Sequence, residues 1–98
     1  MIDENSTKEE ALEAVKQDGW ALAYASETFK LDKDVVLAAV RQNGRALWYA
    51  SNNLKDDQDV VLTAVEQCWG AIEYASNRLK REIIQSWIES MKQETKDD

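Results

Sequence analysis

The chain contains no histidine, one cysteine and three glycines among its 98 residues, and these shortages exclude most kinds of catalytic site. Without histidine the protein lacks the commonest general base and the commonest metal ligand. The single cysteine, Cys68, has no second thiol for a disulfide and no histidine to activate it as a nucleophile. The few glycines do not form a phosphate-binding loop. We therefore predict a non-enzymatic protein with no catalytic residues, no cofactor and no metal site.

Long apolar runs are also missing, and the N-terminal stretch MIDENSTKEE is acidic and polar. A membrane-spanning helix needs about 20 apolar residues, and a targeting signal needs an apolar or basic segment, so neither is predicted. The length fits one domain, residues 1–98. Together with the lone cysteine, these features favour an intracellular, cytoplasmic protein.

Acidic residues outnumber basic ones, which gives a net charge of −7 at pH 7. Nucleic acids and anionic membranes are bound by clustered Lys and Arg, so neither is an expected partner. The charge is unevenly spread, because residues 31–55 carry four Lys and Arg against two Asp and Glu, whereas the segments on either side are acidic. The middle of the chain is its only basic part.

The tripeptide YAS occurs three times at a spacing of 25 residues, first at Tyr24. The repeated units are residues 6–30, 31–55 and 56–80. They align without gaps, and the second and third units are identical at 15 of 25 positions. A period of this length is typical of stacked helical repeats. The fold class that we predict is all-α, a small right-handed stack of three two-helix repeats closed by a longer C-terminal helix.

Each unit is predicted to hold two short helices. The first helix begins after an N-cap residue, which is Thr7, Asp32 or Asp57. Glu10 follows Thr7 at the spacing of a capping box. Gly19 and Gly44 are expected to end this helix in the left-handed conformation. The second helix runs from about 21 to 26, 46 to 51 and 71 to 76, and an apolar anchor follows it at Phe29, Leu54 and Leu79.

The pattern changes after Lys80. The segment KREIIQSWIESMKQ places apolar residues at helical spacing, namely Ile83, Ile84, Trp87, Ile88 and Met91. We predict a capping helix over residues 81–94 that closes the stack, with Trp87 in the core. Met1 and this closing helix favour a complete chain over a piece of a longer array.

The pattern D-x-x-V-V-L-x-A-V-x-Q-x-G-x-A-L-x-Y-A-S begins at Asp32 and resembles the short bacterial repeat family called domain of unknown function 4116 (DUF4116). The resemblance covers about residues 6–80. The third unit departs from the pattern, because Cys68-Trp69-Gly70 replaces Asn43-Gly44-Arg45 and the glycine arrives one residue late. The resemblance implies tandem helical units, and it implies no catalytic residues and no known activity.

Three of the four tryptophans occupy positions that are not tryptophan in the other units. Trp48 aligns with Ala23 and Glu73, and on a helical wheel it points away from the apolar face. Trp20 aligns with Arg45, so neighbouring units are expected to bring them together, with Trp48 three residues beyond Arg45. The candidate protein-binding residues are Trp20, Arg41, Arg45 and Trp48. An exposed Trp–Arg cluster has the composition of a binding hot spot, but the same tryptophans are also suited to sealing the groove between units.

The sequence leaves three interpretations open. The first is a helical-repeat interaction module that binds a protein through the candidate residues. The second is a small acidic inhibitor or immunity-type protein that covers a basic enzyme surface, with acid clustered at Asp56, Asp57 and Asp59. The third is a homodimer formed through the apolar stripe of the C-terminal helix.

Overall fold

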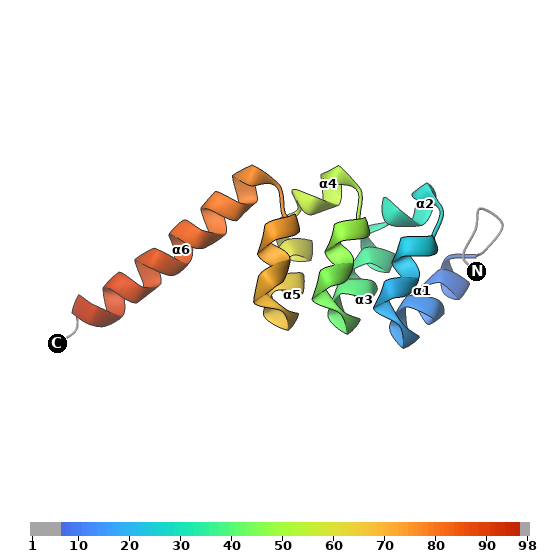
Figure 1. Ribbon diagram of the computed structural model, residues 1–98, viewed down its shortest axis with the longest axis horizontal. Helices are drawn as coiled ribbons and strands as arrows, with labels where there is room; N and C mark the ends of the chain where they lie inside the picture. Colours follow the sequence, from blue (N-terminus) through green and yellow to red (C-terminus); the bar gives the residue numbers. More distant parts are fainter. Residues whose placement is uncertain (1–6, 97–98) are drawn as a thin grey trace.

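The computed structural model describes residues 7–96, and every element in this range is a helix (Figure 1). In chain order these are α1 (Lys8–Gln17), η1 (Gly19–Tyr24), α2 (Glu27–Lys30), α3 (Lys33–Gln42), η2 (Gly44–Tyr49), α4 (Asn52–Lys55), α5 (Gln58–Gln67), η3 (Trp69–Tyr74) and α6 (Asn77–Lys96), where η marks a 3₁₀ helix. The predicted all-α class is confirmed. An α-helix, a 3₁₀ helix and a start of another α-helix recur in the same order in all three units.

The helices lie in rows across an elongated molecule of 58 × 23 × 17 Å. α1, α3 and α5 stand side by side, with α3 in contact with both others (Figure 1). The 3₁₀ helices η1, η2 and η3 form a second row that packs against the first. Within residues 7–96 no helix combines the length and apolar character that crossing a bilayer requires.

The predicted N-caps of the long helices are confirmed. Thr7 and Glu10 form the full capping box, in which each side chain accepts the backbone N–H of the other residue. The Asp32 carboxylate accepts the N–H groups of the second and third residues after it, and Asp57 does the same. These bonds satisfy amide groups that a helix start leaves without an intrahelical partner.

One hydrophobic core runs through all three units. Its fully buried valines and leucines come from both rows of helices and include Val15, Leu22, Val35, Val36, Val40, Leu47, Val60 and Val61. The predicted apolar anchors Phe29, Leu54 and Leu79 are also buried. Burying one such side chain contributes about 1.5–3 kcal/mol, so this repeated face is the main source of stability.

The prediction that Gly19 and Gly44 end the first helix in a left-handed conformation is wrong. No residue in the range 7–96 has a positive φ. The residues that follow α1 and α3 are Asp18 and Asn43, which are extended with φ of −152°. Their side chains cap the following 3₁₀ helix by accepting an N–H two residues on. Each glycine therefore begins the second helix, which is tighter and starts two residues earlier than predicted.

Adjacent units are joined by polar contacts that repeat with the 25-residue period. The Lys8 ammonium lies 2.8 Å from the carboxylate of Asp34 in the next unit, and Lys33 lies 3.2 Å from that of Asp59. The Ser51 N–H donates to the carbonyl oxygen of Lys30, and Ser76 and Lys55 repeat this bond. These contacts join each unit to its neighbour near the start of the long helix.

The C-terminal helix differs from the predicted capping helix over 81–94. α6 begins at Asn77, inside the third unit, and projects away from the body as a rod (Figure 1). Among residues 77–92 of α6 the buried side chains are Leu79 and Ile83. α6 therefore covers part of α5 and does not close the end of the row.

Candidate functional site

A half-exposed tryptophan lies at each junction between units. The ring of Trp20 packs edge-on against Tyr49 of the second unit, with 5.8 Å between ring centroids. Trp48 packs in the same way against Tyr74 of the third unit, at 5.3 Å. The exposed fractions are 41% for Trp20 and 57% for Trp48, so each ring seals a junction and still presents a face to solvent. These four residues form the aromatic seam.

The two tryptophans reach equivalent tyrosines from different positions in their units. Trp20 is the second residue of η1, and Trp48 is the fifth residue of η2. A 3₁₀ helix has three residues per turn, so positions two and five lie directly above one another. Either position can therefore place an indole over the next tyrosine. In these two units Ala23 and Arg45 occupy the alternative positions.

The third unit has a different aromatic contact. Trp69 stacks on Trp87 of α6, with 4.1 Å between ring centroids and 16° between ring planes. The prediction that Trp87 belongs to the core is wrong, because its side chain is 47% exposed. Trp69 aligns with Gly19 and Gly44, the two residues that lie against the helix of a following unit. In the third unit this position lies beside Trp87 of α6, and a large ring fits there.

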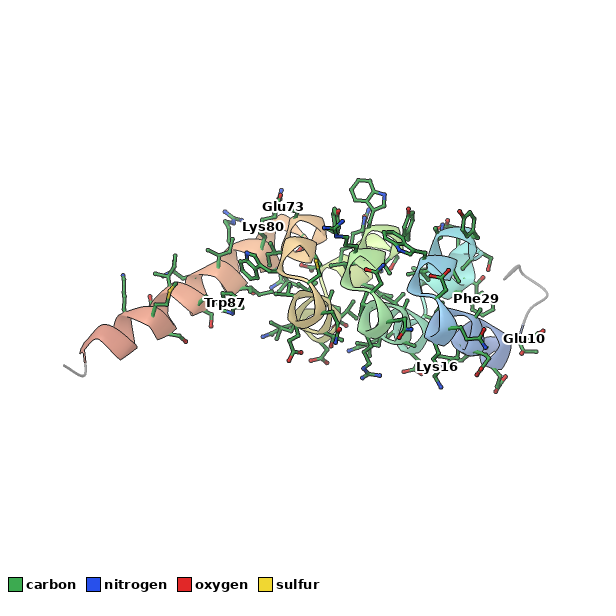
Figure 2. The ribbon with its side chains drawn as sticks, turned by 60° about the horizontal axis from the view of Figure 1, so that its bottom comes forward. Glu10, Lys16, Phe29, Glu73, Lys80 and Trp87 are labelled. Atoms are coloured by element: carbon green, nitrogen blue, oxygen red, sulfur yellow. The ribbon has the colours of Figure 1, made fainter. Side chains whose placement is uncertain are left out.

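The lysine that ends each unit has a different neighbour in each case. Lys80 pairs with Glu73 at 3.8 Å, and both lie along the same edge of the molecule (Figure 2). Trp48 stands in the position of Glu73, and the Lys55 ammonium lies over its ring at 5.1 Å from the centroid. In the first unit that position is alanine, and the equivalent Lys30 pairs instead with Glu27 at 3.6 Å. Lys55 is therefore placed over an indole where its counterparts meet a carboxylate.

Arg45 reaches across the same junction as Trp48. The Arg45 guanidinium lies near the Cys68 side chain of the third unit, and its influence, followed by that of the backbone N–H of Gly70, lowers the pKa of the thiol below its ordinary value. The hydroxyl of Tyr74 is also near enough to act on the pKa of Arg45. Trp48 packs on Tyr74, Lys55 lies over Trp48, and Tyr74 is near Arg45, so the four residues share one junction. The sequence analysis missed Lys55. The alignment could have identified it, because Trp48 aligns with Glu73 and Lys55 aligns with Lys80, the lysine that pairs with Glu73.

The structure divides the four candidate residues between separate places. Arg45 and Trp48 share one junction, whereas Trp20 lies at the neighbouring one and contacts Tyr49 rather than Arg45. Arg41 is exposed in the last turn of α3, and within the described residues no hydrogen bond or ion pair joins it to the other three. No cation–π contact joins Trp20 to Arg45 among the described residues, and the expected proximity of the two side chains stays a prediction.

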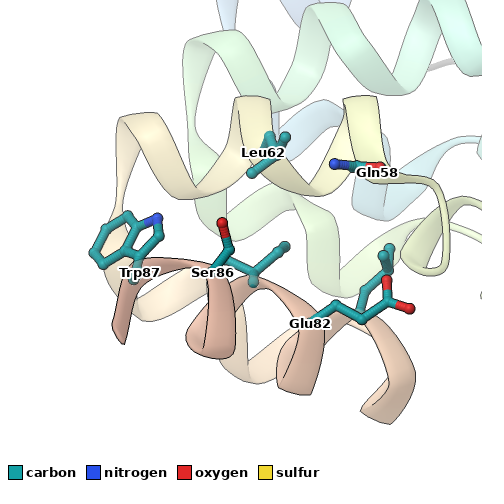
Figure 3. A pocket seen from close by; sticks show the side chains of 7 residues that line it. Gln58, Leu62, Glu82, Ser86 and Trp87 are labelled. Carbon is teal, nitrogen blue, oxygen red and sulfur yellow. The ribbon is translucent and has the colours of Figure 1, made fainter. Parts of the chain in front are cut away.

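A small cavity of about 120 Å³ lies between α5 and α6 (Figure 3). Its lining residues are Gln58, Leu62, Leu79, Glu82, Ile83, Ser86 and Trp87. Pockets that hold drug-sized ligands have volumes of about 300 Å³ or more, so this space reflects incomplete packing of α6. Among the side chains of residues 7–92 no group of three or more acidic or thiol groups is placed to bind a metal ion.

One family model matches the chain. It is described as "Domain of unknown function (DUF4116)", and it matches residues 7–55 and again residues 46–80. The two overlapping matches are consistent with tandem repeats and together span three quarters of the sequence. No curated protein and no solved structure gives a match.

Proposed function

This chain belongs to the DUF4116 family, and we propose that it is a non-enzymatic helical-repeat module that binds a protein partner. The observation that carries the proposal is the aromatic seam, in which tryptophan rings remain about half exposed at consecutive junctions. Tryptophan and arginine are enriched among residues that dominate binding energy at protein interfaces. The second junction, with Trp48 and Arg45, is the proposed centre, and Trp20 and Arg41 lie at its periphery.

We further propose that the three units form a right-handed stack. The recurring order of elements, the contacts of α3 with α1 and α5, and the repeated Lys–Asp pairs support a regular relation between neighbours. Stacks of this kind present extended surfaces formed by side chains from several units. The seam, which crosses both junctions, is such a surface.

The repeats provide a matched variant for the test. Trp48→Glu recreates in the second unit the arrangement that Glu73 and Lys80 already have in the third. The variant is therefore expected to fold, and its circular dichroism and melting temperature verify this. We expect the wild type to capture from its native lysate a protein that Trp48→Glu does not capture, and the pair to bind again when both are purified. A partner captured equally by both proteins would contradict the proposed centre.

A second candidate function is self-association through α6. Ile84, Trp87 and Ile88 are each more than a third exposed and lie along one side of a helix that projects from the body. Two copies of this stripe packed together would bury the exposed apolar surface. Sedimentation equilibrium of the wild type and Ile84→Glu/Ile88→Glu tests it, because a dimer should be lost in the double variant.

The acidic-inhibitor interpretation has weaker support. Of the carboxylates at the starts of the long helices, Asp34 and Asp59 already pair with lysines, and Asp56 pairs with Arg78 at 3.0 Å. These acids are partly neutralised within the chain and are less available to a basic partner. Binding that weakens steeply with salt and persists in Trp48→Glu would favour the inhibitor instead.

A further inference from the structure

We propose that the second junction binds an acidic peptide segment of the partner, with an apolar side chain against Trp48 and carboxylates against Lys55 and Arg45. This inference rests on the proposed interaction function and adds the chemical class of the partner. It follows from a comparison of the same position in the three units, which share one backbone arrangement and differ in charge. Arg45, Trp48, Lys55 and Tyr74 together form the cationic junction.

The first observation is the set of partners of the terminal lysines. Lys30 and Lys80 each have a carboxylate partner inside the chain, at 3.6 and 3.8 Å. Lys55 has none among the described residues, since Trp48 occupies the place of the carboxylate and the ammonium rests over the indole. A lysine over an aromatic ring keeps its charge and most of its donors free, so it can bind a carboxylate from outside.

The second observation is that Arg45 adds another cation without an acidic partner. Arg45 lies near the Cys68 side chain, and among the side chains that the structure describes, residues 7–92, no ion pair joins it to a carboxylate. Arg45 and Trp48 are three residues apart on a 3₁₀ helix and therefore share one face. The junction thus combines two available cations with a tryptophan that is 57% exposed.

The charge of the rest of the molecule selects among anionic partners. The net charge is −7, and two cations at one junction do not attract a nucleic acid or a lipid surface, which bind to extended clusters of Lys and Arg. A short peptide segment needs only local charge complementarity and one apolar contact. Carboxylates beside an aromatic or aliphatic residue match the cations and the indole of the cationic junction.

The repeat supplies two variants that separate the contributions. Trp48→Glu removes the ring and gives Lys55 the intramolecular partner that Lys80 has. Arg45→Gly places at this position the residue found at Gly70 and removes the second cation. Both variants copy a residue that another unit of the same chain already has, and thermal melts of each establish that it is folded before binding is compared.

The experiment is a selection from a random twelve-residue peptide display library on the immobilised wild type, with Trp48→Glu as the counter-selection. We expect the enriched peptides to contain more Asp and Glu than Lys and Arg, together with an aromatic or aliphatic residue. A synthetic copy of the most enriched peptide, titrated while Trp fluorescence is monitored, should bind the wild type at least tenfold more tightly than Trp48→Glu. The analogue peptide in which Glu is replaced by Gln and Asp by Asn should bind the wild type with a similar loss of affinity. The original peptide should show a similar loss of affinity for Arg45→Gly.

The other possible results of the selection overturn the acidic-peptide proposal in different ways. Enrichment of neutral or basic peptides that still need Trp48 overturns the acidic-peptide proposal and leaves the interaction function standing. No enrichment over Trp48→Glu overturns the peptide proposal, while the lysate capture judges the interaction function separately. Binding of single-stranded DNA that depends on Trp48, or a dimer that Trp48→Glu dissolves in sedimentation equilibrium, would replace the acidic peptide with a nucleic acid or a second copy of the chain.

Discussion

Gly19 lies so close to the backbone carbonyl oxygen of Ala39 that a Cβ placed on it would stand 2.7 Å from that oxygen. The contact joins the start of η1 to the last turn of α3, and the equivalent Gly44 lies in the same way against Ala64 of α5. The glycine of the repeat is thus required by the neighbouring unit and not by its own backbone conformation. Trp69, the equivalent residue of the third unit, has α6 beside it instead.

Gly19→Ala and Gly44→Ala should therefore destabilise the protein. The added methyl group meets a backbone oxygen that cannot rotate away, so the two units must separate, at a cost of about 1–3 kcal/mol each. Urea unfolding followed by circular dichroism measures the loss. Gly70→Ala is the matched control, because the nearest atom to its Cβ is the Cys68 sulfur at 3.8 Å. Equal losses at all three glycines would contradict the junction argument.

The lysine–aspartate contacts between units should make the stability of the fold depend on pH. Lys8 donates a hydrogen bond to Asp34 at 2.8 Å, and this bond, with the Coulombic attraction, lowers the pKa of that carboxyl below its ordinary value of 3.8. A carboxyl with a lower pKa in the folded state stabilises the fold above about pH 4 and loses that effect as pH falls through the folded value.

We expect Lys8→Gln to reduce stability at pH 6 and to reduce the difference in stability between pH 6 and pH 2.5, as measured by thermal melts. Gln58 occupies the equivalent position in the third unit, so glutamine suits the site. Lys16→Gln is the control, because it removes the same charge from a lysine that has no ion pair among the described residues. Identical pH profiles for both variants would show that the Lys8–Asp34 contact has no such role.

The reactivity of Cys68 should report whether Arg45 crosses the second junction. Since Arg45 is the largest influence that lowers the pKa of the thiol, Arg45→Gln should raise that pKa. The midpoint of the pH profile for alkylation by iodoacetamide should shift upward in this variant. Arg41→Gln removes an equal charge from α3 and should leave the midpoint unchanged. A midpoint that is insensitive to Arg45 would mean that the two side chains do not meet in solution.

The stacked indoles of Trp69 and Trp87 should hold the first turns of α6 against the body. A stacked aromatic pair contributes about 0.5–1.5 kcal/mol beyond the area that it buries. Trp87→Ala should therefore speed tryptic cleavage after Lys80 and Arg81, while the melting temperature falls by only a few degrees. Trp48→Ala, which removes an indole from another junction, should not change that cleavage rate. Unchanged cleavage in Trp87→Ala would assign the hold on α6 to Leu79 and Ile83 alone.

Much of the fold follows from the sequence because the period places identical residues in identical surroundings. The N-caps at Asp32 and Asp57 and the buried Phe29 and Leu54 were predictable, since each depends on local hydrogen bonding or on apolar spacing. The glycine assignment failed for a physical reason. Glycine is favoured both where the backbone has a positive φ and where another backbone segment comes close to the Cα atom. A single sequence does not distinguish these two uses, because the position of the neighbouring backbone is not known from it.

The site was less predictable than the fold. The sequence predicts Arg45 and Trp48 as neighbours at i and i+3 of a helix, and the 3₁₀ geometry of η2 also places them on one face. The predicted partner of Trp20 was the residue at its own position in the next unit, and the observed partner is Tyr49, four residues further along. Lys55 was overlooked because its seven-residue distance from Trp48 matters only when the chain turns back after η2.

The second unit alone carries both sides of every contact between units. It offers Asp34 to the lysine before it and Lys33 to the carboxylates after it, and it combines Gly44 with Tyr49. The first unit supplies only the residues that contact the unit after it, and the third supplies only those that contact the unit before it. Residues 31–55 can therefore pack against a copy of themselves. A gene in which this segment is duplicated in tandem should encode a longer array whose added units make the same contacts with their neighbours.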